Sequence, residues 1–376
     1  MSIKIIRAVT VSSSIGFFEP TIKDLQERGY EIVSVSSPGA NLSRLRELGV
    51  NTIEVPMERH ISLFKDLKSL FNLIRVFRKE KPQMVHSMTP KAGMLCMLAA
   101  FLTRVPRRVH TFTGLVWPTA TGLKRKILMA TDWLTCACAT HVIPEGMGVM
   151  NDLQNHITKK PMKVLGYGNV RGVDMKRFSR RPEVEKLAKE IKKEDIFTFI
   201  FVGRIVGDKG INELALAFTD LQKKYDNIRL LLVGNFEQNL DPLKPETLKI
   251  INENPGIELL GPKYGDDLLA CYAASDCFVF PSYREGFPNT VMEAGAMDLP
   301  SIVTDINGSR EIIVHDKNGV IIPSKNTEAL YHAMEEILTN TEKTKKYASN
   351  AREMIASRFE RNFVCQCLYD FYDEIM

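Results

Sequence analysis

Short apolar runs alternate with longer stretches of helical periodicity along the first 170 residues. The apolar and β-branched runs predict strands at residues 3–11, 31–36, 52–55, 84–87, 108–112, 140–144 and 164–167. Helices are expected between them at residues 20–28, 41–48, 61–79, 91–103 and 124–138. The helix over 61–79 carries an apolar stripe at positions 61, 64, 67, 70, 71, 74 and 77. Strands and helices that alternate at this spacing predict a doubly wound parallel sheet.

A second alternating series begins at Phe197, after a charged segment (residues 182–195) that suits a surface helix or a linker. Its strands are expected near residues 197–202, 228–233, 257–260, 277–280, 300–303 and 319–322. The tail predicts three further helices, over 327–336, 341–355 and 360–375. A length of 376 residues also exceeds that of one ordinary domain, so the sequence predicts two.

The stretch over residues 281–294 contains the strongest candidate chemistry. It follows the strand-like run 276–280, which the proline at its end cannot continue. Residues 289–290 form a good helix N-terminus. A helix that begins just past the carboxyl end of a buried strand directs its free N–H groups and positive dipole end into the crevice there. The pattern therefore predicts an anion site, which Glu285 and Glu293 frame.

Two cations are expected beside this site. Arg204 and Lys209 follow the first strand of the second series, in the segment Gly203-Arg-Ile-Val-Gly-Asp-Lys-Gly210. They should lie at the carboxyl edge of that strand, in the same crevice as Glu285. Two cations placed there can stabilise negative charge that builds on a leaving group, without a metal ion. The alternative is a solvated arginine and lysine in an ordinary loop.

These motifs resemble those of a known enzyme family. Glu285 and Glu293 form an E-x7-E pair with Gly-Phe-Pro-Asn-Thr between them and Pro-Ser-Tyr-Arg before them, and this run resembles the signature of family 4 glycosyltransferases. The segment 203–210 is similar to the Gly-Arg…Lys-Gly segment of that family. Gly-Val-Asp at residues 172–174 is similar to a run at the family's domain junction. Members of this family are retaining enzymes of the GT-B fold.

The resemblance implies an α/β fold in which two Rossmann-like domains, each with a parallel sheet, face each other across a cleft. Residues 1–170 would form the acceptor-binding domain, and residues 171–355 the domain that binds the nucleotide sugar. A terminal helix, residues 356–376, would cross back to the first domain.

The resemblance also implies roles for individual residues. As catalytic residues, Arg204 and Lys209 would hold the diphosphate, whereas Glu285 and His110 would hold the transferred sugar. A carboxylate can accept hydrogen bonds from two vicinal hydroxyl groups, which suits Glu293 to the ribose. The residues expected to bind the donor are Gly16, Arg204, Lys209, Lys263, Tyr264, Glu285, Gly286, Phe287, Pro288, Asn289, Thr290 and Glu293.

Several of these residues have plainer interpretations. Gly16 would let the backbone approach the diphosphate and the acceptor, but a glycine in an ordinary β–α turn explains it as well. His110 and His86 both occur at strand ends, where a lone histidine is often structural. Lys263 and Tyr264 would bracket the nucleobase. We expect no metal ion and no cofactor, because no Asp residue is placed to supply a DxD-type metal motif.

Charge divides the chain unevenly. Residues 1–170 contain 23 Lys and Arg against 12 Asp and Glu, whereas the remainder contains 27 against 33. The basic positions that flank apolar helices in the first half are Lys91, Arg104, Arg107, Arg108, Lys124, Arg125 and Lys126. They are either solvated helix faces or a rim that rests on anionic lipid, and the confinement of the excess to one half favours the rim. No aromatic–basic platform for nucleic acid is found.

The compartment follows from what the sequence lacks. Its longest apolar run, residues 92–102, is too short to span a bilayer, and the N-terminus has no signal-peptide pattern. Seven scattered cysteines, an odd number without a CxxC motif, suit reduced thiols in the cytosol better than disulfides or zinc. We expect a cytoplasmic protein that is peripheral on the inner face of the membrane.

The closest resemblance is to bacterial transferases that extend lipid-carrier-linked oligosaccharides for capsule, O-antigen or protein glycosylation. It implies transfer of a hexose or N-acetylhexosamine from a UDP-sugar to a lipid-linked saccharide. Three alternatives stay open: a UDP-sugar 2-epimerase of GT-B fold, a non-enzymatic sensor of sugar nucleotides, and a transferase with a small soluble acceptor. An epimerase would not be expected to combine the two charged motifs, and a sensor would release its UDP-sugar intact.

Overall fold

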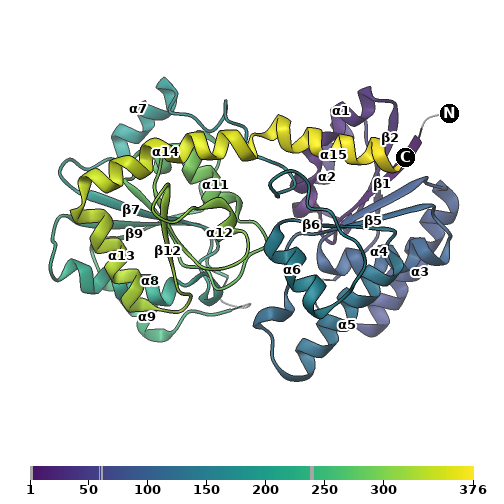
Figure 1. Cartoon of the computed structure of the whole chain (residues 1–376), viewed down its shortest axis with the longest axis horizontal. Coiled ribbons are helices and arrows are strands. Elements are labelled where there is room, and N and C mark those ends of the chain that lie inside the picture. The colour runs from purple at the N-terminus through teal and green to yellow at the C-terminus, as the bar shows by residue number, and fades with distance from the viewer. Residues whose placement is uncertain (1–2, 59, 61, 238–240) are drawn as a thin grey trace. The chain divides into compact units, whose positions relative to one another are not determined.

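The computed structural model describes residues 3–58, 60, 62–237 and 241–376. The chain divides into two compact units (Figure 1). Unit 1 comprises Met1–Gly172 together with Arg361–Met376, and unit 2 comprises Val173–Glu360. Unit 2 is therefore inserted into unit 1 along the chain, and the two units are described separately below.

Unit 1 is built on a parallel sheet in the order β3-β2-β1-β4-β5-β6. Its strands are β1 (Ile3–Ala8), β2 (Tyr30–Ser36), β3 (Asn51–Glu54), β4 (Met84–Met88), β5 (Arg107–Phe112) and β6 (His141–Pro144). The predicted strand over residues 164–167 is wrong. That segment is largely exposed, and Gly166 has a φ of +54°, which extended strands do not adopt.

Helices cover both faces of this sheet. They are α1 (Ile22–Glu27), α2 (Leu42–Glu47), α3 (Leu63–Glu80), α4 (Pro90–Leu102), α5 (Gly122–Cys138), α6 (Met147–His156) and α15 (Arg361–Ile375), with 3-10 helices η1 (Ser12–Phe17), η2 (Glu19–Thr21) and η3 (Trp117–Thr119). The predicted helix over 61–79 is α3, and its first expected position, Ile61, lies outside the described residues.

The last helix, α15, completes the core of unit 1. Leu368, Phe371 and Tyr372 are buried there among side chains of β1, β2, α1 and α2. The Tyr369 hydroxyl donates to Asp24 of α1 at 2.7 Å. In Figure 1 this yellow helix accordingly lies beside the purple N-terminal elements of the same unit. Residues 356–359, in contrast, continue a helix of unit 2.

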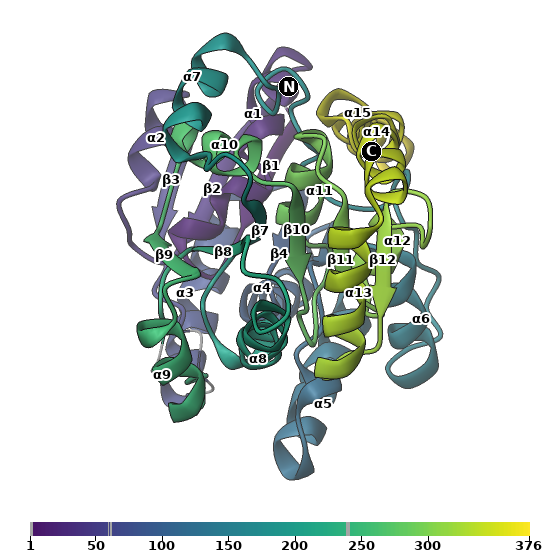
Figure 2. The same ribbon diagram turned by 90° about the vertical axis from the view of Figure 1, so that its left-hand side faces the viewer.

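Unit 2 repeats the same topology, with a parallel sheet in the order β12-β11-β10-β7-β8-β9. Its strands are β7 (Phe197–Val202), β8 (Ile228–Val233), β9 (Ile257–Gly261), β10 (Cys277–Phe280), β11 (Ser301–Thr304) and β12 (Gly319–Ile322), which Figure 2 shows side by side. Strands β8, β10 and β11 are buried at every position, as expected for a parallel sheet that helices cover on both faces. The predicted strands of this half are confirmed.

Helices of unit 2 begin at recognisable signals. Pro182 occupies the first position of α7, and the Asn326 side chain accepts from the Ala329 N–H at the start of α13. The helices are α7 (Pro182–Ile191), α8 (Ile211–Gln222), α9 (Pro245–Glu253), α10 (Gly265–Ala273), α11 (Asn289–Ala296), α12 (Ser309–Ile312), α13 (Thr327–Thr339) and α14 (Thr341–Phe359), with the 3-10 helix η4 (Gly207–Lys209).

None of the helices in the described residues combines the length and the apolar composition that a membrane crossing requires. All seven cysteines are free thiols, and six of them are buried. Both sheets have the strand order of a doubly wound Rossmann-like fold. The first three strands extend the sheet toward one edge and the next three toward the other, so the strand order reverses between two central strands.

Candidate functional site

The strand order locates the candidate site of unit 2. The strand order reverses between β7 and β10, which are parallel neighbours in the sheet. In open parallel sheets, ligands bind outside the carboxyl ends of the strands at such a reversal. The loops that leave these two carboxyl ends contain Arg204 and Lys209 after β7, and Glu285 after β10.

Two glycines allow the loops to meet closely. Gly210 has a φ of +73°, and a Cβ at this position would lie 2.1 Å from the carbonyl oxygen of Pro281. Gly308 has a φ of +74°, and its Cβ would lie 2.4 Å from the carbonyl oxygen of Gly286. A side chain at either position would push the loop after β10 away from its neighbours. The loops after β7, β10 and β11 are thus held together at one place.

Polar contacts fix the loop after β7 against the loop after β10. The Tyr283 N–H donates to the carbonyl oxygen of Asp208 at 2.8 Å. The Arg284 guanidinium donates to the Asp208 carboxylate at 2.9 Å. The Tyr283 hydroxyl also donates to Glu213 of α8 at 2.5 Å. These contacts hold the site residues in place before any ligand binds. The loops therefore lose less conformational entropy when a ligand binds.

The centre of the site is an ion pair. The Lys209 ammonium donates to the Glu285 carboxylate, and the two side chains are only 12% and 15% exposed. The Ser282 hydroxyl donates to the same carboxylate oxygen at 2.8 Å, and the Lys209 ammonium lies 5.5 Å from the centre of the Phe280 ring. An ammonium group has three N–H donors. Lys209 can therefore donate to an incoming anion while Glu285 keeps it oriented.

Glu293 lies deeper in unit 2. It faces inward from α11 and is 7% exposed. The Tyr272 hydroxyl group of α10 is near it: burial raises the pKa of Tyr272 well above its ordinary value, and the Glu293 charge adds to this shift. Phe287 and Pro288, which lead into α11, are also buried, whereas Asn289 and Thr290 of its first turn are half-buried.

Arg204, Lys263 and Tyr264 follow the carboxyl ends of β7 and β9, on the same edge of the sheet, and are not part of the ion pair. Arg204 is exposed and pairs with Glu237 at 3.1 Å. Lys263 and Tyr264 lie between β9 and α10, and the Tyr264 ring is 73% exposed. An exposed aromatic ring at the carboxyl edge of a sheet has a free face on which a base could stack. Its role at a nucleobase stays a prediction.

Unit 1 has its own reversal point, between β1 and β4. Gly16 follows β1 but lies inside the 3-10 helix η1 rather than in an open loop, and a Cβ built on it meets no atom within 4 Å. Packing within the chain therefore does not require a glycine there. The open space beside Gly16 is compatible with the approach of a ligand, and that role stays a prediction.

Two threonines at this reversal point were not singled out from the sequence. Thr89 has a φ of +71°, which costs free energy for a β-branched residue, and its hydroxyl group lies 2.8 Å from that of Thr10. The Ala92 N–H, in the first turn of α4, donates to the Thr10 hydroxyl at 3.1 Å. The sequence feature that could have indicated Thr89 is the Thr89-Pro90 dipeptide directly after a strand.

The two strand-end histidines are buried in unit 1. His110 is 1% exposed; its Nδ1 lies 2.9 Å from the Ser87 hydroxyl, and its ring contacts Phe112 edge to face. A Cβ on Gly93 would lie 2.4 Å from the same ring. His86 lies between the Tyr372 hydroxyl at 2.6 Å and the Thr111 hydroxyl at 2.7 Å. His86 therefore connects β4 to α15, while the role of His110 near a sugar stays a prediction.

Burial makes unit 1 sensitive to acid. It lowers the pKa of His110 to about 3, and it lowers the pKa of His86 well below the ordinary value near 6.5. Below pH 6.5 the unfolded chain therefore takes up protons that the folded unit cannot bind. We expect His110 to lower the free energy of unfolding by about 2 kcal/mol between pH 7 and pH 5, and His86 to act in the same direction.

Urea unfolding at pH 7 and pH 5, followed by tryptophan fluorescence, measures this loss. Both tryptophans, Trp117 and Trp133, belong to unit 1. His110→Gln should show a pH dependence smaller by about 2 kcal/mol, whereas the exposed His332→Gln should show the full dependence. An unchanged dependence in His110→Gln would contradict the expectation.

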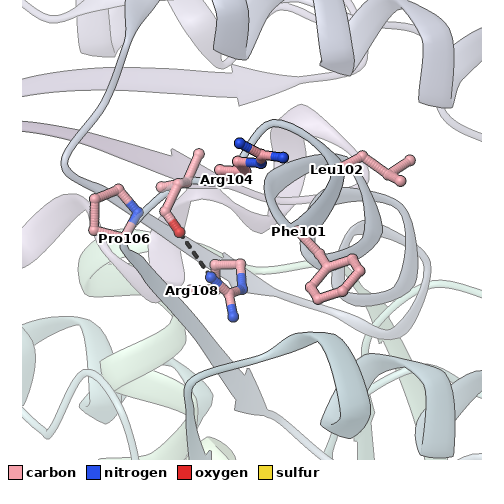
Figure 3. A pocket seen from close by; sticks show the side chains of 6 residues that line it. Phe101, Leu102, Arg104, Pro106 and Arg108 are labelled. Carbon is pink, nitrogen blue, oxygen red and sulfur yellow. Dashed lines mark hydrogen bonds between the residues drawn. The ribbon is translucent and has the colours of Figure 1, made fainter.

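The predicted basic rim of unit 1 is only partly exposed. Lys91 is buried in an ion pair with Asp66, and Arg107 donates to the carbonyl oxygens of the last two residues. Arg108 donates to the Val105 carbonyl oxygen at 2.8 Å and lines a cavity of about 430 Å³ at the end of α4 (Figure 3). Of the seven predicted rim residues, Arg104, Lys124 and Lys126 are exposed, and Arg107, Arg108 and Arg125 are partly exposed.

Within the described ranges, no group of three or more His, Cys, Asp or Glu side chains is arranged to hold a metal ion. The charged side chains described above at the candidate site are those of Lys209, Glu285, Arg204, Glu293 and Lys263, together with the Asp208–Arg284 pair. A lysine held by a carboxylate, an exposed arginine on the same sheet edge and the start of α11 are groups that favour an anion.

Two protein-family models match the chain, one within each unit. A family model described as "Glycosyl transferase 4-like domain" matches residues 18–168, and one described as "Glycosyl transferases group 1" matches residues 183–354. Capsular polysaccharide biosynthesis glycosyltransferase CapM of Staphylococcus aureus is 32% identical over 377 residues, which cover 99% of this chain and 97% of that protein.

A second relative is the UDP-Gal:alpha-D-GlcNAc-diphosphoundecaprenol alpha-1,3-galactosyltransferase of Escherichia coli. It is 30% identical over 313 residues, which cover 80% of this chain and 78% of that protein. Among solved structures, Anabaena HepE in complex with UDP-glucose superposes with a TM-score of 0.80 at 18% identity, over 99% of both chains. At that identity the likeness concerns the fold.

Proposed function

This chain belongs to the family 4 glycosyltransferases of the GT-B fold, and we propose that it transfers a hexose or N-acetylhexosamine from a UDP-sugar to a lipid-linked saccharide with retention of configuration. The observation that carries the proposal is the Lys209–Glu285 ion pair at the reversal point of unit 2. It combines a cation suited to a diphosphate with a carboxylate suited to sugar hydroxyl groups.

The proposed reaction exchanges one bond at the anomeric carbon for another. The bond from this carbon to the diphosphate oxygen breaks, and charge builds on the departing UDP. Lys209 and Arg204 stabilise that charge, so that no metal ion is needed. An acceptor hydroxyl group then attacks the oxocarbenium-like centre from the same face and gives its proton to the departing phosphate oxygen.

The remaining residues orient the donor. Glu285, held by Ser282, accepts hydrogen bonds from sugar hydroxyl groups. Glu293 accepts from the ribose, and Tyr264 with Lys263 brackets the base. The N–H groups at the start of α11 add positive potential beside the diphosphate.

The lipid-linked acceptor is supported by the relatives rather than by a bound ligand. The E. coli relative is named for a UDP-galactose donor and a diphosphoundecaprenol-linked acceptor, and the S. aureus relative for capsular polysaccharide biosynthesis. We extend this chemistry to the present chain, which would act as a peripheral protein on the inner face of the cytoplasmic membrane.

Release of UDP from a panel of UDP-sugars, with and without lipid extracted from bacterial membranes, tests the proposal. We expect release for one sugar only when lipid is present, and an anomeric configuration in the product that matches the donor by NMR. Glu285→Ala should abolish release, whereas the exposed Glu253→Ala on α9 should not. Release without lipid would favour a soluble acceptor, and conversion of one UDP-sugar into another would favour an epimerase.

A further inference from the structure

The first half of α3 presents its apolar side chains to solvent. Leu63, Phe64, Leu67 and Phe71 are 76%, 89%, 63% and 55% exposed. The last three follow the i, i+3, i+7 spacing that places residues on one face of a helix. A surface helix normally directs such a stripe toward the core. The predicted apolar stripe of this helix is therefore divided, because its C-terminal members, such as Phe77, do face the core.

Polar anchors hold this orientation. On the opposite side of the same turns, Asp66 and Ser69 are 8% and 4% exposed. Asp66 pairs with Lys91 of α4 at 2.5 Å, and both side chains are about nine-tenths buried. The Ser69 hydroxyl donates to the Pro56 carbonyl oxygen. Rolling the helix to bury its phenylalanines would break these contacts and leave Lys91 unpaired in the interior, which is strongly unfavourable. The outward apolar stripe is thus a fixed property of the unit.

Within α3 itself, the outward face carries cations and no acidic side chain, and beside it Lys65 pairs with the exposed Glu58 of the preceding segment. Lys68 lies within the apolar stripe, and Arg75, Arg78 and Lys79 continue it toward the end of the helix; all four are exposed. The Arg75 guanidinium lies 4.3 Å from the centre of the Phe71 ring. The acidic residues of α3 are turned away from this face: Asp66 pairs with Lys91, and Glu80 pairs with Lys4. The outward face of α3 is therefore mainly apolar in the first half of the helix and cationic in the second half.

We propose that this stripe of α3, formed by Leu63, Phe64, Leu67, Lys68, Phe71 and Arg75, is the surface by which the protein binds an anionic lipid bilayer. Large apolar side chains would enter the boundary between headgroups and acyl chains, and the lysine and arginine side chains would contact the lipid phosphates. A second copy of the chain fits less well, because apposing two such faces would bring like charges together. A bilayer offers acyl chains to the apolar side chains of the stripe and phosphates to its cations.

This inference rests on the proposed function only for the biological role of membrane binding. That role would be to hold the acceptor site of unit 1 at the membrane, where a lipid-linked saccharide resides. It also revises the basic rim expected from the sequence. Lys91 does not contact lipid but instead anchors α3 in the orientation that exposes the stripe. The binding itself needs neither donor nor acceptor, and it can be measured without them.

Flotation of the full-length chain with vesicles tests the inference. One vesicle set contains phosphatidylcholine alone, and the other also contains phosphatidylglycerol. We expect binding mainly to the anionic set. The triple variant Phe64→Ser, Leu67→Ser, Phe71→Ser should bind at least about tenfold more weakly. Lys68→Glu with Arg75→Glu should also lose about tenfold or more, and only on anionic vesicles.

Matched controls use comparable exposed residues elsewhere. Leu48→Ser, Leu216→Ser and Leu259→Ser replace leucines that are 40–41% exposed and lie outside α3. Lys223→Glu with Lys249→Glu reverses two exposed charges of unit 2. Both control variants should bind vesicles as the unaltered chain does. Because the replaced α3 side chains are exposed, circular dichroism should show every α3 variant folded.

Three outcomes would overturn the inference: no binding of the unaltered chain to anionic vesicles, full binding by the triple α3 variant, or a concentration-dependent dimer that the triple variant abolishes. Failure of the UDP-release assay would leave vesicle binding untouched, so the two proposals fail separately. If both hold, the triple variant should lose transfer to acceptors embedded in vesicles but keep transfer to a short-chain acceptor in detergent.

Discussion

Replacing Lys209 by alanine is expected to lower the rate of sugar transfer about a thousandfold, the largest effect of any single substitution in the site. Lys209 is nearly buried and oriented by Glu285, so its charge acts in a poorly solvated place. The measurement is the rate of UDP release at saturating donor and acceptor, with the affinity for UDP determined separately by calorimetry. A cation that acts mainly in the transition state should change the rate more than the affinity.

The lysine-to-alanine change also leaves Glu285 without its partner, and this must be separated from catalysis. Lys223→Ala, at an exposed lysine of unit 2, controls for loss of a positive charge. Lys209→Ala combined with Glu285→Gln removes the unpaired carboxylate. If the double variant recovered most of the rate, the effect of Lys209 would be structural, and the proposed role at the diphosphate would be wrong.

Replacing Tyr372 by alanine is expected to destabilise unit 1 by about 3–5 kcal/mol. The side chain is fully buried, donates to or accepts from His86, and lies 5.9 Å from the Arg7 guanidinium. Its removal would leave a cavity between α15 and the sheet and would deprive two buried polar groups of a neighbour. Urea unfolding followed by tryptophan fluorescence reports this unit, since both tryptophans lie in it.

Two variants on the same helix sharpen this test. Tyr372→Phe should cost only about 1 kcal/mol, the usual net value of one hydrogen bond. Phe363→Ala, on a side chain of α15 that is 42% exposed, should cost about 1 kcal/mol or less. Equal losses in Tyr372→Ala and Phe363→Ala would show that α15 is held by its ends rather than by its buried face.

The strands could be predicted because buried parallel strands are nearly continuous apolar runs. Residues 228–233 and 277–280 have this composition and form β8 and β10. Residues 164–167 resemble them, but among the described residues only the Lys163 N–H, at 3.3 Å, donates to the β6 backbone, and the chain then turns at Gly166. Local composition could not reveal that no partner strand continues beside this segment.

The centre of the candidate site could also be predicted, because the carboxyl ends of parallel strands meet at one edge. Lys209 and Glu285 follow different strands and are in contact. Ser282, which holds Glu285, could not be identified, since a serine in a loop has no distinctive spacing. The direction of the α3 stripe was unpredictable for a different reason: it depends on the Asp66–Lys91 pair, whose members are 25 residues apart.

The position of α15 in the core of unit 1 has a consequence for synthesis on the ribosome. The first 172 residues are made before unit 2, whereas the helix that covers the apolar side chains of β1, α1 and α2 is made after it. At about 5–20 residues per second, translation of the intervening segment takes on the order of ten to forty seconds. During that interval the apolar side chains that α15 later covers lack this partner, and a chaperone at the ribosome could bind them. Unit 2 does not need α15, because its two ends are joined by the hydrogen bond from the Val173 N–H to the Phe359 carbonyl oxygen, so it can fold before α15 is made.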